Sequence, residues 1–372
     1  MEESETENSV YNDEKLNWGI LSRYRSQLSG IAIIMIMVFH YSENVIQAGK
    51  NNPAYHFADG WYQLFGSIGV ELFLIVSGVG LWFSFEKSPK VLPFYRRRLK
   101  RIVLPYFIVA VPFYILRDIV IQYKMSGKTE NFVKVLKDIF FVDFFENGDR
   151  ILWYIIFIMM MYLLFPIFFL LVKEEKKLAG KKYDWYILPI IVSGFLICLS
   201  HVIALSYPDF WKGTEIAWTR VSVFFLGVFI GEKVYKNRKL SAGDTVLFGM
   251  AVSIKMLSFG KAFVFWRQQN RIVTGYLSLV LIVTIAIICS GAEIYIKNEK
   301  IISKCSSALT WCGERSLELY MIHVTIRGLF NDIGFYTFEL WHYLICLAAS
   351  FLLSAGLHEM VNRIWHIGRN VR

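Results

Sequence analysis

The chain contains few charged residues, little proline and no paired cysteines. Only 19% of its 372 residues are Asp, Glu, Lys or Arg, whereas 55% are hydrophobic. Soluble domains carry about 25% charged and about 45–50% apolar residues, so this composition excludes disorder and argues against a soluble enzyme. With only 8 prolines and 25 glycines, the chain is neither collagenous nor of low complexity. The class that fits is a polytopic α-helical membrane protein.

Motifs of several common activities are also missing. The five cysteines form no C-x-x-C pair, so we expect neither a disulfide framework nor a zinc site, and we assign no metal. Walker A, H-E-x-x-H and G-x-S-x-G patterns do not occur, which leaves ATP-driven, zinc-protease and hydrolase functions without support. The net charge of +10 comes largely from basic residues in short loops between apolar runs, without a basic–aromatic recognition module. We therefore expect no nucleic-acid partner.

Ten apolar segments are candidates to cross a membrane, which takes about 20 residues. Lysine and arginine concentrate in alternate loops and in both tails, as they do in cytoplasmic segments under the positive-inside rule. We therefore predict an all-α polytopic membrane protein with about ten transmembrane helices and with cytoplasmic N- and C-termini. The predicted spans cover residues 28–47, 65–85, 102–121, 151–172, 185–206, 217–233, 243–260, 272–290, 314–331 and 340–362.

One transmembrane domain is expected to take up almost the whole chain. We predict a polar cytoplasmic tail at residues 1–20, a transmembrane domain at 21–364 and a short basic cytoplasmic tail at 365–372. The first tail is acid-rich and does not have the basic start and apolar middle of an export signal, so we expect the first span to be retained. In the longest loop, 122–149, apolar residues at helical spacing predict an amphipathic helix on the outer surface.

Ionisable residues inside the spans are candidates for function, because a bilayer interior tolerates them only beside a cavity or a partner. Arg117 and Asp118 are neighbours on one predicted helix, so they point to different faces and need not pair with each other. Arg220 and Arg327 can each neutralise an acid elsewhere. The whole set is His40, Glu71, Arg117, Asp118, Arg220, Lys255, His323 and Arg327.

His40 and Glu71 each have a catalytic and a structural explanation. His40 lies roughly 18 Å along its helix from the inner edge of the membrane, where a neutral imidazole can act as general base towards a hydroxyl. It can equally be a histidine whose hydrogen bonds are satisfied by a neighbouring helix. Glu71 either hydrogen-bonds His40 and fixes its tautomer or faces water at the membrane interface.

The basic segment Arg96–Arg101 also has two explanations. Clustered arginines bind phosphate through paired hydrogen bonds, so a nucleotide-like cofactor can dock there from the cytosol. The same cluster can also set topology and hold anionic lipid headgroups. His323, close to Tyr320 on the ninth predicted helix, either lines the cofactor entrance or satisfies a backbone carbonyl.

These segments follow one another as in the acyltransferase family 3 membrane proteins, and the chain resembles that family from about residue 21 to residue 362. Each segment alone is a weak signal, but their joint order and spacing are specific. The segments that carry the resemblance are Ser29–Ala32 with Phe39–His40, Gly69–Phe73 with Ser77–Gly78, Arg97, Arg98 and Arg101 before Leu104–Tyr106, Trp153–Tyr154 with Tyr162 and Pro166, Phe225–Gly227, and Ser316–His323.

The resemblance implies an O-acyltransferase in a bacterial cytoplasmic membrane. Such proteins move an acyl group, commonly acetyl, from cytosolic acyl-CoA to a sugar hydroxyl of an envelope or extracellular glycan. We accordingly assign His40 as general base and Glu71 as the acid that orients it. The residues expected to bind acyl-CoA are Arg25, Arg98 and Arg101 at its phosphates and Tyr106, Trp153 and His323 along its channel.

The chain departs from the family pattern in two respects. The family has an arginine eleven residues before the histidine, where this chain has Ser29. Arg25 lies one turn earlier on nearly the same helix face, about 6 Å further out, and can take over the role. Many relatives also have a C-terminal extracytoplasmic hydrolase-like domain. We expect a stand-alone form that acts directly on its acceptor or with an envelope-assembly partner or a second copy.

Two non-enzymatic functions are alternatives. A glycan exporter or assembly partner on the same scaffold needs a polar conduit but no CoA site. An ion-coupled transporter predicts inverted repeats and broken mid-membrane helices, and neither is visible in the sequence.

Overall fold

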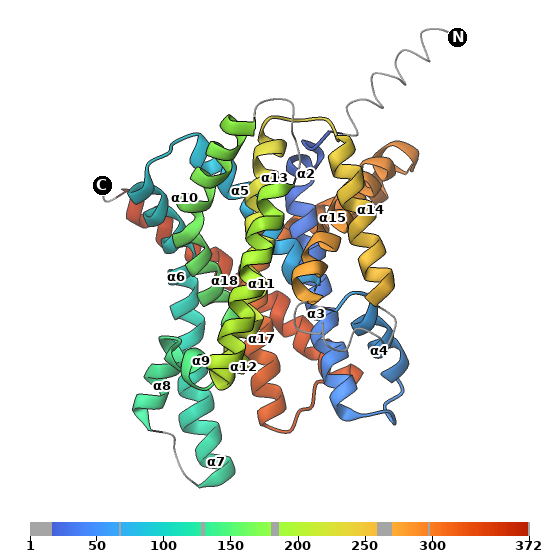
Figure 1. The fold of residues 1–372 in the computed structure, drawn as a ribbon. Coiled ribbons are helices and arrows are strands. Elements are labelled where there is room, and N and C mark those ends of the chain that lie inside the picture. The colour runs from blue at the N-terminus through green and yellow to red at the C-terminus, as the bar shows by residue number, and fades with distance from the viewer. Residues whose placement is uncertain are drawn as a thin grey trace.

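The computed structural model describes residues 17–66, 68–127, 131–179, 186–258, 270–296 and 298–370. These residues are almost entirely helical (Figure 1), and their only strand-like pairing is a single bridge between Asn17 and Lys239. The predicted all-α fold is confirmed. In chain order the helices are α2 (Ile20–Arg23), α3 (Arg25–Ala48), α4 (Tyr55–Leu64), α5 (Ile68–Glu86), α6 (Val91–Tyr114), the π-helix η1 (Ile115–Ile121), α7 (Gln122–Ser126), α8 (Phe132–Ile139), α9 (Val142–Glu146), α10 (Trp153–Ala179), α11 (Ile187–Ser206), α12 (Pro208–Trp218), α13 (Val221–Tyr235), α14 (Ala242–Ser258), α15 (Asn270–Tyr295), α16 (Glu299–Glu314), α17 (Ser316–Asp332) and α18 (Leu340–Asn370).

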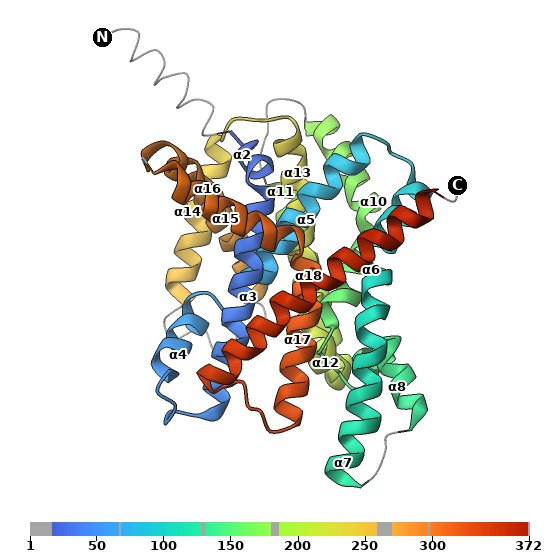
Figure 2. The same cartoon turned by 180° about the vertical axis from the view of Figure 1, so that it is seen from behind.

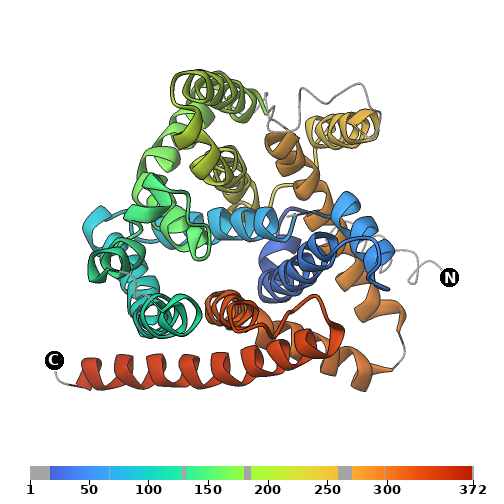
Figure 3. The same cartoon turned by 90° about the horizontal axis from the view of Figure 1, so that it is seen from below.

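The bundle has two ends, which we name after the short helices that lie there. Helix α2 lies at one end, the α2 end, and helices α4, α8, α9 and α12 lie towards the other, the α4 end (Figure 1). Helix α18 runs diagonally across the bundle, from the α4 end back towards the α2 end (Figure 2). Seen end-on, it lies along one side of the molecule (Figure 3).

Eight helical stretches of the described residues are long and apolar enough to cross a membrane, fewer than the ten predicted spans. The prediction at 243–260 coincides with α14, whose apolar part, Ala242–Ser253, is shorter; its last two residues and the side chain of Lys255 lie outside the described part. The prediction at 314–331 coincides with α17, which has 17 residues and carries four ionisable ones, Glu318, His323, Arg327 and Asp332. Helices α16 and α17 together make that passage across the bundle (Figure 2).

Glycines bring the central helices into backbone contact. A side chain at Gly78 of α5 would come within 2.6 Å of the backbone of Gly227 on α13, and one at Gly313 of α16 would come still closer to the backbone of Ser26 on α3. Small residues at such crossings let membrane helices approach closely. The contact of Gly313 with α3 holds the end of α16, and with it the start of α17, against α3. The candidate site lies at this place.

The ends of the domain and the longest loop differ in detail from the predictions. Trp18, inside the predicted tail, is buried and its indole donates a hydrogen bond to Asp244, so the packed part of the chain begins before residue 21. Helix α18 continues to Asn370, past the predicted boundary at residue 364. The amphipathic helix expected in the loop is α8, whose Val135 is buried while Phe132 is exposed.

Candidate active site

Two cavities enter the bundle from opposite ends and meet in its middle. The first, of about 330 Å³, opens towards the α2 end and contains three arginines; we call it the basic cavity. The second, of about 630 Å³, opens towards the α4 end and contains His40; we call it the histidine cavity. The side chains of Ile36, Val70 and Tyr320 line both cavities and separate them.

The three arginines of the basic cavity are Arg25, Arg98 and Arg101. Arg25 is the first residue of α3, while Arg98 and Arg101 are one turn apart on α6 and so share a face. None of the three forms an ion pair within the described chain. Neighbouring cations without counter-ions favour a ligand with several negative charges, because charge-assisted hydrogen bonds to phosphate are strong. The structure thus brings together the three predicted phosphate ligands.

The remaining cations of the basic segment lie on another face of α6. Arg96 and Lys100 line a groove of about 930 Å³ between α6 and α18, together with Ile364 and Trp365. Arg97 borders this groove and also a smaller depression beside His358, which Arg98 and Arg101 line as well. The two explanations of the segment therefore apply to different side chains. Arg98 and Arg101 line the basic cavity, whereas Arg96 and Lys100 line the outer groove and are placed to meet the surrounding lipid.

His40 projects from α3 into the histidine cavity. Its ring stacks on that of His323, with the centroids 5.4 Å apart and the planes at 15°. The Nδ1 atom of His40 is buried and has no hydrogen-bond partner among the described residues. The ring as a whole is half-buried and borders the cavity, which is the placement that a general base for a substrate hydroxyl requires.

His323 lies behind His40 and does not line either cavity, which corrects its predicted place along the channel. Its side chain is fully buried, and Nε2 is 3.3 Å from the hydroxyl of Tyr343. That hydroxyl donates its proton to the carbonyl of Met37, so the Nε2 atom of His323 must carry the hydrogen of this contact. The contact with Tyr343 therefore fixes the tautomer of His323, on whose ring His40 stacks.

Glu71 takes a different partner from the predicted one. Its Oε1 atom lies 3.5 Å from Nη2 of Arg220, and both side chains are buried. Arg220 also donates a hydrogen bond of 2.7 Å to the carbonyl of Ile216 and lies over the ring of Trp153, 5.2 Å from its centroid. Glu71, Arg220 and Trp153 all line the histidine cavity. The predicted hydrogen bond from Glu71 to His40 is thus replaced by an ion pair in the cavity wall.

Two aromatic residues predicted to line the donor channel lie elsewhere. Trp153 lines the histidine cavity, not the basic one. Tyr106 reaches neither: its hydroxyl donates a 2.6 Å hydrogen bond to the carbonyl of Ile139, and its ring stacks on Phe141. The reason is helical geometry, because five residues at 100° each turn Tyr106 roughly 140° away from Arg101. Tyr106 anchors α8 against α6.

The tyrosines Tyr154, Tyr162 and Tyr320 line the basic cavity. The rings of Tyr154 and Tyr320 meet edge to face at 5.3 Å, directly beside the boundary between the cavities.

Glu43 also lines the histidine cavity but is not among the site residues predicted from the sequence. Its place one turn after His40 on the same helix was a usable signal.

Four aspartates gather near the α4 end around two cations. Arg117 lies 2.5 Å from Asp118, 3.1 Å from Asp138 and 3.3 Å from Asp149. Adjacent residues on a helix need not pair, but Arg117 and Asp118 do so here, within the π-helix η1. Lys134 lies 2.6 Å from Asp143.

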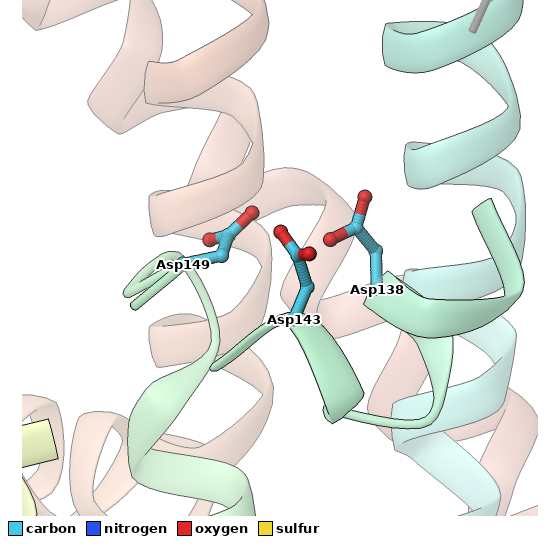
Figure 4. A group of neighbouring side chains, drawn as sticks. All are labelled: Asp138, Asp143 and Asp149. Carbon is cyan, nitrogen blue, oxygen red and sulfur yellow. The ribbon is translucent and has the colours of Figure 1, made fainter. Parts of the chain in front are cut away.

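Asp138, Asp143 and Asp149 place carboxylate oxygens within 4.8 Å of one another (Figure 4). Their geometry would suit a cation, but Arg117 and Lys134 already take the facing oxygens. Burial raises the pKa of Asp138 to about 7, against the opposing effect of Lys134 and Arg117. For Asp143 burial acts to raise the pKa, but the hydrogen bonds from Lys134 and Asn147 and the charge of Lys134 together lower it. The group fastens α8 and α9 to η1.

Comparison with known proteins identifies the scaffold around the two cavities. Residues 28–359 match the family model for the acyltransferase domain of acyltransferase family 3. Comparisons with curated proteins and with solved structures gave no match. The matched range includes every residue that lines the two cavities except Arg25 and Ser26. The chain therefore belongs to acyltransferase family 3 and is a membrane acyltransferase.

Proposed function

We propose that the protein is an O-acyltransferase that moves a short acyl group such as acetyl from acyl-CoA in the basic cavity to a glycan hydroxyl in the histidine cavity. The observation that carries the proposal is the meeting of these two cavities at Ile36, Val70 and Tyr320. The α2 end, with its basic loops, faces the cytoplasm by the positive-inside rule. Donor and acceptor then arrive from opposite sides of the cell membrane.

The charges of the basic cavity suit CoA, which carries several phosphate groups. Arg25, Arg98 and Arg101 are its proposed ligands. Ser29, where the family has its arginine, lines the same cavity as Arg25. This supports a substitution in which Arg25 reaches the ligand from one turn earlier on α3.

The proposed reaction needs one base and one leaving group. As the acceptor oxygen attacks the thioester carbonyl, the imidazole of His40 takes the hydroxyl proton. The new C–O bond forms, the C–S bond breaks, and the proton passes from the imidazolium to the departing thiolate. His323 and Glu71 are proposed as positioning residues, the first through its stacking on His40 and the second through Arg220.

Export of a glycan on the same scaffold would need a continuous passage. Ile36, Val70 and Tyr320 stand between the cavities, an arrangement that fits group transfer better than passage of a whole saccharide.

The proposal is tested by incorporation of radiolabel from acetyl-CoA into envelope glycan by membranes that contain the protein. We expect His40→Ala to abolish incorporation and His201→Ala, a histidine on the exposed face of α11, to leave it unchanged. Equal incorporation by wild type and His40→Ala at equal levels of folded protein would refute the role of His40. Absence of both incorporation and acetyl-CoA binding in the wild type would refute the proposed donor.

A further inference from the structure

Every arginine that lines the histidine cavity already has a carboxylate partner. Arg220 lies 3.5 Å from Glu71, and Arg327 lies 3.2 Å from Glu43. Arg150 lies 3.6 Å from Glu215. The cations of this cavity are therefore neutralised by the protein itself.

The basic cavity is built in the opposite way. Its arginines have no ion-pair partner within the described chain, and the one carboxylate at its edge, Glu314, lies beside Arg315. Two adjoining cavities of one protein thus differ in charge: one offers unpaired cations, and the other offers paired ones. The basic cavity therefore favours an anionic ligand, and the histidine cavity does not.

An anionic ligand in the histidine cavity would meet fixed carboxylates. To bind Arg327 or Arg220 it must displace Glu43 or Glu71, and a displaced carboxylate left without a partner in a partly closed site is costly. Hydroxyl groups meet no such barrier, since they donate to carboxylates and accept from arginines at once.

The rest of the lining suits an uncharged polyol. Gln47 and Gln63 provide amide groups, and the rings of Tyr62 and Trp153 provide flat apolar surfaces. Tyr62 is further supported by stacking on Phe39 at 5.6 Å.

We propose that the acceptor unit is an uncharged saccharide, and that the Glu43–Arg327 and Glu71–Arg220 pairs exclude uronic acids and other anionic sugars. The inference rests on the proposed function and narrows its substrate class. Glu43 is the specificity-determining residue that lies most open to the cavity, with about a third of its side chain exposed.

The test uses acceptor pairs that differ only in charge. Purified protein in liposomes receives radiolabelled acetyl-CoA and either a methyl glucoside or the matching methyl glucuronide, and likewise the galactose and galacturonic acid pair. We expect the neutral member to be acetylated at least about tenfold faster in the wild type, because like charges at a recognition site are strongly rejected. Glu43→Gln leaves Arg327 unpaired and is expected to shift the ratio towards the uronide.

The matched control is Glu86→Gln, whose carboxylate pairs with Lys173 outside both cavities; it should leave the ratio unchanged. Equal or faster transfer to the uronides, or a ratio that Glu43→Gln does not move, would overturn the inference while leaving acyl transfer intact. Acetyl-CoA binding without transfer to any saccharide would overturn it too, because the cavity would then not be a saccharide site. Absence of acetyl-CoA binding would refute the proposed function itself.

Discussion

His40 and His323 stack with their rings 5.4 Å apart and nearly parallel, and the hydroxyl of Tyr343 holds the second ring from its far side. The proposed base, His40, therefore stacks on His323, whose tautomer is fixed through Tyr343 by the carbonyl of Met37. A chain of contacts of this kind can orient an imidazole without any charged partner.

Replacement of Tyr343 by Phe tests this support. The change leaves the Nε2 hydrogen of His323 buried without an acceptor, which costs about 1–3 kcal/mol. We expect a lower kcat with an unchanged KM for acyl-CoA, because the donor cavity is untouched. Tyr336→Phe, at an exposed tyrosine of the loop before α18, is the control. A rise in the KM for acyl-CoA with normal kcat would show that Tyr343 does not act through His40.

The arginines of α6 allow a comparison within one helix. Arg98→Ala or Arg101→Ala should raise the KM for acyl-CoA at least about tenfold, since each removes a charge-assisted hydrogen bond of about 1.5–3 kcal/mol. Arg96→Ala and Lys100→Ala remove equal charge from the face that lines the groove beside α18, and we expect little change. Equal effects of all four substitutions on KM would mean that only the overall charge of the segment matters.

The Glu71–Arg220 pair is expected to be strongly coupled. Glu71→Gln leaves a buried guanidinium without its carboxylate, which costs about 3–5 kcal/mol. The double substitution Glu71→Gln with Arg220→Gln should cost less than the two single changes added together. Thermal unfolding in detergent measures all three variants, with Glu359→Gln at the exposed pair with Arg363 as the control. Strict additivity would contradict the pairing.

The raised pKa of Asp138 predicts that stability at the α4 end depends on pH. Its pKa is raised from 3.8 to about 7 in the folded protein, so between these values the folded state binds a proton that the unfolded state has lost. The resulting stabilisation is greatest at low pH and is lost as the pH rises through about 7.

We therefore expect hydrogen-exchange protection of α8 and α9 to fall between pH 5.5 and pH 8, after correction for intrinsic rates. Asp138→Asn should remove most of this dependence, whereas Asp209→Asn, at an exposed residue of α12, should keep it. A protection profile that is flat in the wild type would show that Asp138 is ionised throughout.

The sequence predicted the helices and the cations better than the contacts between helices. Arg98 and Arg101 lie one turn apart, so their common face could be read from spacing alone. The partner of Glu71 could not, because Arg220 is the N-cap residue of α13, far along the chain, and only packing of α5 against α13 brings the two together. His323 was found as an unusual residue, but its place behind His40 depends on the fold of α17 and α18.

Two other differences are local. Arg117 pairs with its neighbour Asp118 within the π-helix η1, a contact that helical spacing alone does not predict. The span predicted at 314–331 corresponds to α17 alone; α16, which ends at Glu314 just before it, is too polar for hydropathy to mark as part of the same passage. Tyr106 could have been assigned correctly from its angle around α6 relative to Arg101.

The central claim is that the acyl group passes from the basic cavity to a hydroxyl at the opposite end of the bundle. The direct test is transfer across sealed liposomes, with labelled acetyl-CoA enclosed on the side of the α2 end and a membrane-impermeant saccharide on the side of the α4 end. The account predicts labelled saccharide with wild-type protein and none with His40→Ala. Labelling that occurs only when donor and saccharide share one side of the membrane would contradict it.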